Sequence, residues 1–162
     1  MAQVDYFLKL KGIEGESSDK SHKNEIELLS WSWGATNAGS HASGSGGGAG
    51  KVQIQDFHFV MLINKSSPKL FLACASGEHI PEGLLTCRKA GKEQQEFLKV
   101  KFTDLLVSSY QTGGSGHGDV VPTDQISLNF AKVEFEYKPQ NADGSLGGSV
   151  NTGWDQKKNV KV

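Results

Sequence analysis

Alternation of apolar and polar residues with a period of two is the strongest constraint on how this chain can fold. A period of two places successive side chains on opposite faces of a β-strand. The pattern recurs in six stretches, at residues 6–11, 25–33, 51–63, 84–89, 96–110 and 125–138. We therefore predict a mainly β protein in which each strand buries one face.

Two of these stretches change phase part-way along. In residues 51–63, Val52 and Ile54 share one phase and Phe57 and Phe59 share the other. Residues 125–138 make the same change after Phe130. A phase change indicates either a bulge or two faces that are each covered over part of their length. Both occur where a sheet curls, so we predict a two-sheet β-barrel.

A single short helix is predicted over residues 67–76. Ser67 can serve as the N-cap, Pro68 suits the first helical position, and Gly77 can end the helix. A helix of this length is marginal alone, so its apolar side must pack on the sheet. We expect one domain over residues 1–162, because a chain of this length supports a single core.

Residues 35–50 are small, polar and dense in glycine. Such a segment cannot bury enough apolar surface to fix its own conformation, so a long flexible loop is predicted. A long loop inside a compact domain usually has a function or an ordering partner.

Composition excludes several classes of function. The chain has 17 basic and 18 acidic residues and a formal net charge of -1, without the basic excess of a nucleic-acid binder. No segment approaches the ~18 consecutive apolar residues of a transmembrane helix, so we expect no membrane insertion. The N-terminus lacks the features of a signal peptide, which indicates a protein that begins in the cytoplasm.

The motifs of catalysis and cofactor binding are incomplete. Residues 44–51 approach a phosphate-binding loop but carry Ser45 where Gly is needed, and a strand rather than a helix follows. The histidines, His117 included, are scattered without zinc-like spacing. Cys74 and Cys87 are too few for a disulfide framework, and whether they pair depends on geometry. We expect no catalytic, metal or cofactor site.

Trp31 and Trp33 flank Ser32 on one predicted strand. Paired indoles can stack on a sugar or peptide, but two Trp on one strand face are more often core or interface anchors. We favour structural anchors, with Trp154 as a third near the C-terminus. The alternative is a monomeric carbohydrate- or peptide-binding β-module that uses Trp31 and Trp33.

Several of these motifs together resemble the Hcp (haemolysin-coregulated protein) family, the inner-tube proteins of type VI secretion systems. They keep order and spacing over nearly the whole chain and are specific only as a set. They are Gly15-Glu16-Ser17, Asp19, His22, Glu25-Ile26, residues 30–34 (SWSWG), 46–51 (GGGAGK), 66–77, 88–91 (RKAG), 107–116 and 128–131 (LNFA).

The resemblance implies a β-barrel with a flanking helix, related to phage tail-tube proteins. It implies a homohexameric ring, stacked into a tube that carries effector proteins and is itself exported without a signal peptide. The implied partners are further copies of the chain, the type VI spike protein, the sheath and effectors.

Candidate residues for these roles follow. Ser32, opposite the two Trp, is our candidate for contact with cargo in the lumen. The candidate ring-stacking contact is the glycine loop, namely Gly46, Gly47, Gly48 and Lys51.

Overall fold

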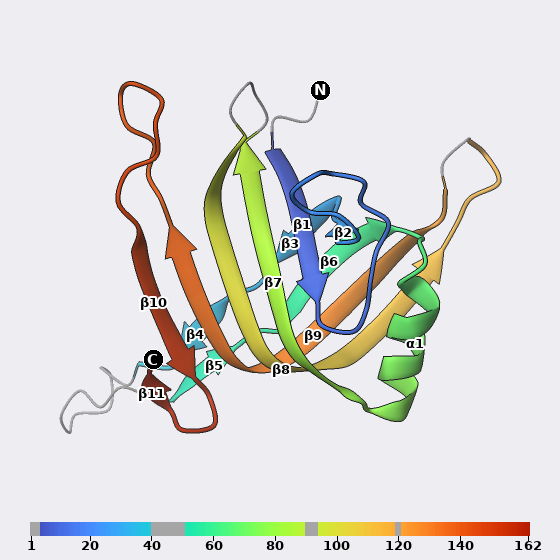
Figure 1. Ribbon diagram of the computed structural model, residues 1–162. Helices are drawn as coiled ribbons and strands as arrows, with labels where there is room; N and C mark the ends of the chain where they lie inside the picture. Colours follow the sequence, from blue (N-terminus) through green and yellow to red (C-terminus); the bar gives the residue numbers. More distant parts are fainter. Residues whose placement is uncertain (1–3, 40–50, 90–93, 119–120) are drawn as a thin grey trace.

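Long antiparallel strands form most of the molecule (Figure 1). The structure is a computed structural model, and it describes residues 4–39, 51–89, 94–118 and 121–162. One helix lies in these residues, α1 (Ser67–Ser76). The strands are β1 (Val4–Leu10), β2 (Ile26–Glu27), β3 (Ser30–Ser32), β4 (Ala35–Asn37), β5 (Val52–Ile54), β6 (Phe57–Leu62), β7 (His79–Lys89), β8 (Gln95–Gly113), β9 (Thr123–Tyr137), β10 (Val150–Asp155) and β11 (Val160–Lys161).

The described strands form two sheets, as the sequence predicted. Nine belong to a curled sheet in the order β11-β10-β9-β8-β7-β1-β2, in which β9 also pairs with β6, and β6 with β3. The segment between β2 and β3 spans the two ends of this curl. Leu28 donates its N–H to Tyr6 of β1, and Leu29 donates to Val60 of β6. The second sheet is a ribbon of β4 and β5.

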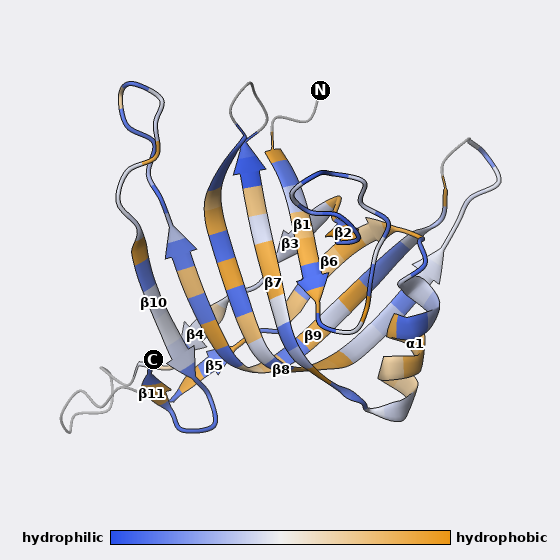
Figure 2. Cartoon of the chain, in the orientation of Figure 1, coloured by the Kyte–Doolittle hydropathy of each residue, from blue (hydrophilic) through white to orange (hydrophobic). Residues whose placement is uncertain are grey.

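The core fills the inside of this barrel. Apolar residues alternate with polar ones along β1, β7, β8 and β9 (Figure 2). Aromatic rings dominate the centre, where Phe102 lies 4.8 Å from Phe57 and 4.7 Å from Phe130 between ring centroids. The largest side chains with no exposed surface are Phe57, Phe59, Phe102, Leu8, Ile26 and Met61.

The phase change in β9 has a counterpart in β8. The pairs Thr103 with Lys132 and Leu105 with Phe130 keep the same register, so one residue of each strand lies between them. The residue in β8 is Asp104, whose φ of 56° is left-handed. The buried residues on both sides of this bend belong to one core cluster. Both strands therefore bend together at this point.

Two predicted strands are interrupted in the structure. Residues 51–63 divide into β5 and β6 at Gln55 and Asp56, so their phase change marks a passage from one sheet to the other. Residues 25–33 divide into β2 and β3, and Leu29 is 54% exposed although Trp31 and Trp33, in the same phase of the alternation, pack against the core. The predicted alternation fails there because the chain changes partner from β1 to β6.

Helix α1 begins at Ser67, so its cap lies one residue earlier than predicted. The N-cap is Ser66 rather than Ser67, and Ser67 and Pro68 are helical. The helix ends at Gly77, whose φ of 73° is the left-handed conformation that glycine adopts without strain. Leu70 and Ala73 are buried against the barrel. The predicted loop 35–50 is also shorter, because Ala35–Asn37 forms β4.

Candidate interaction surfaces

Potential metal ligands do not gather at one place in the described part of the chain. Across residues 4–39, 51–89, 94–118 and 121–162, no group of three or more His, Cys, Asp or Glu side chains could hold a metal. Cys74 and Cys87 are both free thiols, and burial raises the pKa of Cys87 to about 12. In the same described ranges, no helix is long and apolar enough to cross a membrane.

Ser32 lies in a polar row on the outer face of the barrel. Its register partner is His58 of β6, whose own partner is Ser127 of β9. His58 Nδ1 lies 3.1 Å from Ser127 Oγ. Ser127 pairs with Ser109 of β8, so the row crosses four strands. The sequence analysis named only Ser32 as a candidate, because the other residues of this row come together only through strand register.

A second row runs beside the first. Ser30, Val60, Gln125 and Gln111 occupy the same four strands, two residues along. None of the residues in the two rows is Asp, Glu, Lys or Arg. We call this surface the neutral face, made of Ser30, Ser32, His58, Val60, Ser109, Gln111, Gln125 and Ser127.

The other half of β8 and β9 contrasts with the neutral face. There Lys99 pairs with Glu136, and Lys101 pairs with Glu134. Opposite charges across strands are typical of a solvated sheet surface. The same two strands thus change from charged to neutral along their length. The neutral face can donate and accept hydrogen bonds while exerting little long-range attraction on charged groups.

An apolar groove lies at the other side of the barrel, between the ribbon and β10. Its volume is about 790 Å³. Trp33, Phe135 and Trp154 contribute aromatic surface, and Trp33 lies 5.8 Å from Phe135 between ring centroids. Trp154 Nε1 is buried and has no hydrogen-bond partner among the described residues. We call this the β10 groove, lined by Trp33, Ala35, Asn37, Lys51, Val52, Ile54, Val133, Phe135, Thr152, Gly153, Trp154 and Asn159.

The two tryptophans of the SWSW motif do not form one binding platform. Trp31 packs edge-on against Tyr6 at 6.0 Å and lies 6.3 Å from Phe57. Trp33 instead lines the β10 groove, as Trp154 does. Both are half-buried and pack against the core. A ligand that needed Trp31 and Trp33 side by side would not find them so arranged.

The proposed stacking residues are only partly described. Gly46, Gly47 and Gly48 lie outside the described residues. Lys51 is exposed, directly before β5, and contributes to the wall of the β10 groove. The ribbon that precedes the loop is regular, since Ala35 pairs with Ile54 and Asn37 with Val52.

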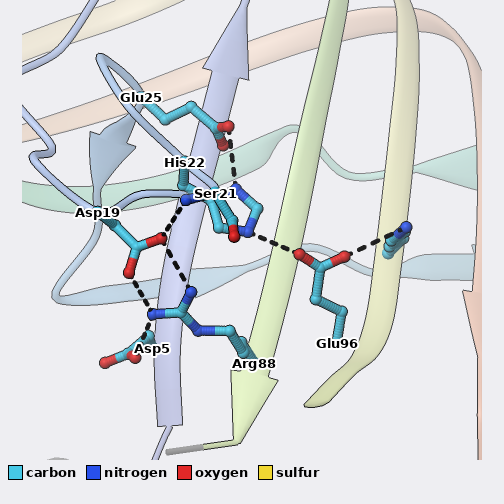
Figure 3. Close-up of polar contacts among 8 residues, drawn as sticks. Asp5, Asp19, Ser21, His22, Glu25, Arg88 and Glu96 are labelled. Atoms are coloured by element: carbon cyan, nitrogen blue, oxygen red, sulfur yellow. Dashed lines mark hydrogen bonds and ion pairs between the residues drawn. The ribbon is translucent and has the colours of Figure 1, made fainter. Parts of the chain in front are cut away.

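A polar cluster that the sequence did not predict holds residues 14–25 on the barrel (Figure 3). His22 is 6% exposed, and its Nδ1 and Nε2 lie 2.9 Å from Glu25 Oε2 and 2.8 Å from Glu96 Oε1. Each ring nitrogen therefore has a carboxylate as its hydrogen-bond partner. The His22 ring also stacks on Phe7 at 4.4 Å.

Arg88 forms the second half of this cluster. It is 3% exposed and binds both carboxylate oxygens of Asp19, at 3.0 and 2.8 Å. A third bond of 3.1 Å reaches Asp5, and the guanidinium lies 4.8 Å from the Phe7 ring centre. The hydrogen bonds from Arg88 lower the pKa of Asp19 to about 2. The ion pairs of Arg88 with Asp19 and Asp5 therefore hold residues 14–25 and β1 against β7.

Comparison with known proteins identifies the family. The family model for the type VI secretion system effector Hcp matches residues 7–137. Protein hcp1 of Pseudomonas aeruginosa is 50% identical over 161 residues, covering 98% of this chain and 99% of that protein. The chain belongs to the Hcp family. It is therefore a type VI secretion protein.

Solved Hcp structures have the same fold. Hcp1 from Salmonella typhimurium is 40% identical, covers 99% of this chain and 100% of its own, and superposes with a TM-score of 0.85. A type VI secretion system effector from Yersinia pestis is 33% identical with a TM-score of 0.76, covering 93% and 99% of the two chains.

The family signature acquires a physical explanation from the cluster. Asp19, His22 and Glu25, three of the residues that carried the resemblance, are the ones that hold residues 14–25 on the barrel. Gly15 belongs to the same signature, and a Cβ there would lie 2.5 Å from the carbonyl oxygen of Glu25. Only glycine fits that approach.

Proposed function

We propose that this Hcp protein is the subunit of a secreted tube. Six copies form a ring, rings stack into the inner tube of a type VI secretion system, and effectors travel in the lumen. Membership of the Hcp family supports this function. The proposed partners are other copies of the chain, the spike protein, the sheath and effectors. The role is structural and not catalytic.

The neutral face is the proposed lumen wall. It carries Ser32, and its side chains form hydrogen bonds without strong charges. A wall of this chemistry can hold a folded effector through several weak polar contacts and still release it. The lack of charge supports a surface that faces cargo rather than bulk solvent.

The remaining parts of the proposal concern stacking and export. The loop that includes Gly46, Gly47, Gly48 and Lys51 contacts the next ring. A net charge of -1 per chain limits repulsion between stacked copies. The protein, one domain over residues 1–162, is held in the bacterial cytoplasm and is then exported through the type VI system without a signal peptide.

Two measurements test this function together. Light scattering coupled to size exclusion should give a mass of six protomers for the purified protein. Ser32→Gln should keep that mass while reducing the amount of effector recovered with the secreted protein, because the longer amide crowds the neutral face. A matched control is Lys20→Glu, at an exposed position away from that face. If the Ser32→Gln variant recovers as much effector as the wild type, Ser32 does not contact cargo.

The alternative is a monomeric carbohydrate- or peptide-binding module. One observation favours such a module with a different pair of indoles, because Trp33 and Trp154 both line the β10 groove. Trp31 has no part in that groove. This function predicts a monomer at high concentration and a change of Trp fluorescence on titration with sugars. A ring mass with no fluorescence response would exclude it.

A further inference from the structure

His58 is chemically distinct from the rest of the neutral face. The other members carry hydroxyl, amide or aliphatic groups, which keep one charge state at all ordinary pH values. Histidine is the side chain that ordinarily gains or loses its charge between about pH 5 and 8. The neutral face therefore contains a single titratable position, and it lies next to Ser32 in the same row.

The His58 ring has a neutral hydrogen-bond partner. The side chain is half-buried, and its Nδ1 lies 3.1 Å from Ser127 Oγ. A hydroxyl can donate to a neutral ring or accept from a protonated one, so this contact suits both charge states. His22 differs, because each of its ring nitrogens has a carboxylate partner. Ser127 thus orients the His58 ring and leaves Nε2 to contact a bound molecule.

One charged group lies beside His58 on the same face. Its register partners on β3 and β9 are serines, and Val60 follows it along β6. Asp56 precedes it by two residues, directly before β6. The Asp56 carboxylate accepts hydrogen bonds from Ser108 Oγ at 2.6 Å and from Asn129 Nδ2 at 2.9 Å. Asp56 is therefore held by neutral groups of β8 and β9, and a bound molecule does not have to displace it from His58.

The chemistry of His58 favours one class of cargo. A bound carboxylate would accept a hydrogen bond from Nε2 and would stabilise the protonated ring. Binding would then take up a proton, so by linkage the affinity rises as pH falls. We propose that His58 makes the neutral face bind acidic protein surfaces, more tightly at pH 6 than at pH 8. This inference rests on the proposed lumen and names the cargo chemistry that its wall recognises.

A labelled peptide of eight aspartates is the probe for this contact. Measured by fluorescence anisotropy at constant ionic strength, the wild type should bind it roughly tenfold more tightly at pH 6 than at pH 8, because charge-assisted hydrogen bonds are the stronger ones. His58→Gln keeps a hydrogen-bonding group that cannot gain a charge, so it should bind weakly at both pH values. His58→Arg carries a permanent charge and should bind tightly at both.

A matched control removes a histidine elsewhere. His79 is exposed and lies on β7, outside the four strands of the neutral face. His79→Gln should therefore keep the pH dependence of the wild type. Light scattering checks that each protein has the same mass, and circular dichroism checks folding.

Calorimetry tests the unaltered protein as well. Titration of the wild type with the same peptide at pH 7, in two buffers of different ionisation enthalpy, should show that protons are taken up on binding. If the wild type takes up no protons, or if His58→Gln keeps the pH dependence, the inference is wrong and the tube function stands. A wild-type monomer would instead overturn the tube function.

Discussion

At the scale of single residues, the polar cluster on β1 is the most tightly determined part of the molecule. Phe7 lies on the outer face of the barrel, where its ring contacts His22 and Arg88 and is 3% exposed. Carboxylates from residues 14–25, β1 and β8 surround these two side chains. Burying a charge is costly unless it is paired, and this cluster pairs Arg88 with Asp19 and Asp5.

The Asp19 carboxylate should give the cluster a defined acid sensitivity. Its folded pKa of about 2 lies below its ordinary value of 3.8. Stability from the Arg88 pair is therefore present above pH ~4 and is lost as pH falls toward 2. Asp19→Asn should lower the free energy of unfolding by about 2 kcal/mol at pH 7, as for a charged hydrogen bond.

Urea unfolding at pH 7, 4 and 2.5 measures this effect. The difference between wild type and Asp19→Asn should shrink between pH 4 and 2.5. Ser18→Ala, at the exposed neighbouring position, should show no such trend. A difference that is equal at all three pH values would contradict the assignment.

At the scale of elements, α1 depends on one buried carboxylate. Asp124 of β9 has no exposed surface and accepts hydrogen bonds from Ser67 Oγ at 2.5 Å and Tyr110 OH at 3.1 Å. Ser67 is in the first turn of α1, where the helix dipole favours a negative charge. Burial, followed by the contact with Asp124, raises the pKa of Tyr110. These bonds fix the helix to the sheet.

Removing the Ser67 hydroxyl should loosen this attachment. Ser67→Ala leaves Asp124 with one hydroxyl donor fewer, in a site that water does not reach. We expect a loss of about 1–3 kcal/mol in unfolding free energy. Hydrogen exchange of the α1 amides should also be faster. Ser76→Ala, at the exposed end of the helix, should change the unfolding free energy by less than about 0.5 kcal/mol. Equal effects from both variants would argue against an anchor at Ser67.

At the scale of the whole molecule, charge and apolar surface are separated into regions. The neutral face lies on one half of β8 and β9, the Lys–Glu pairs lie on the other half, and the apolar β10 groove lies beside the ribbon. In the proposed ring, these regions would meet cargo, solvent and neighbouring copies in turn. Strands that curl into a barrel can point different surfaces in several directions, whereas a flat sheet has only two faces.

Stacking should be separable from ring formation. Gly47→Glu places a negative charge in the proposed stacking loop of every copy, so adjacent rings should repel one another while each ring persists. Sedimentation velocity at rising concentration should show single rings for this variant and higher assemblies for the wild type. Lys20→Glu changes net charge by more and should still stack. If Gly47→Glu stacks as the wild type does, the stacking contact does not involve Gly47.

The sequence by itself determined the features that depend on near neighbours. Alternation predicted the strands, the phase change after Phe130 located the bend in β9, and Pro68 and Gly77 marked α1. Each signal lies within a few residues, where backbone geometry sets which side chains share a face. The motif set also indicated the Hcp family, which the comparisons confirm.

Only the tertiary structure decided which distant residues meet. His22 reaches Glu96, Arg88 reaches Asp19, and Trp33 joins Trp154 in the β10 groove, all across long separations in the chain. It also decided where residues 25–33 and 51–63 break, because those breaks follow a change of strand partner. Such contacts depend on strand order and register, and local periodicity carries no information about which strands become neighbours.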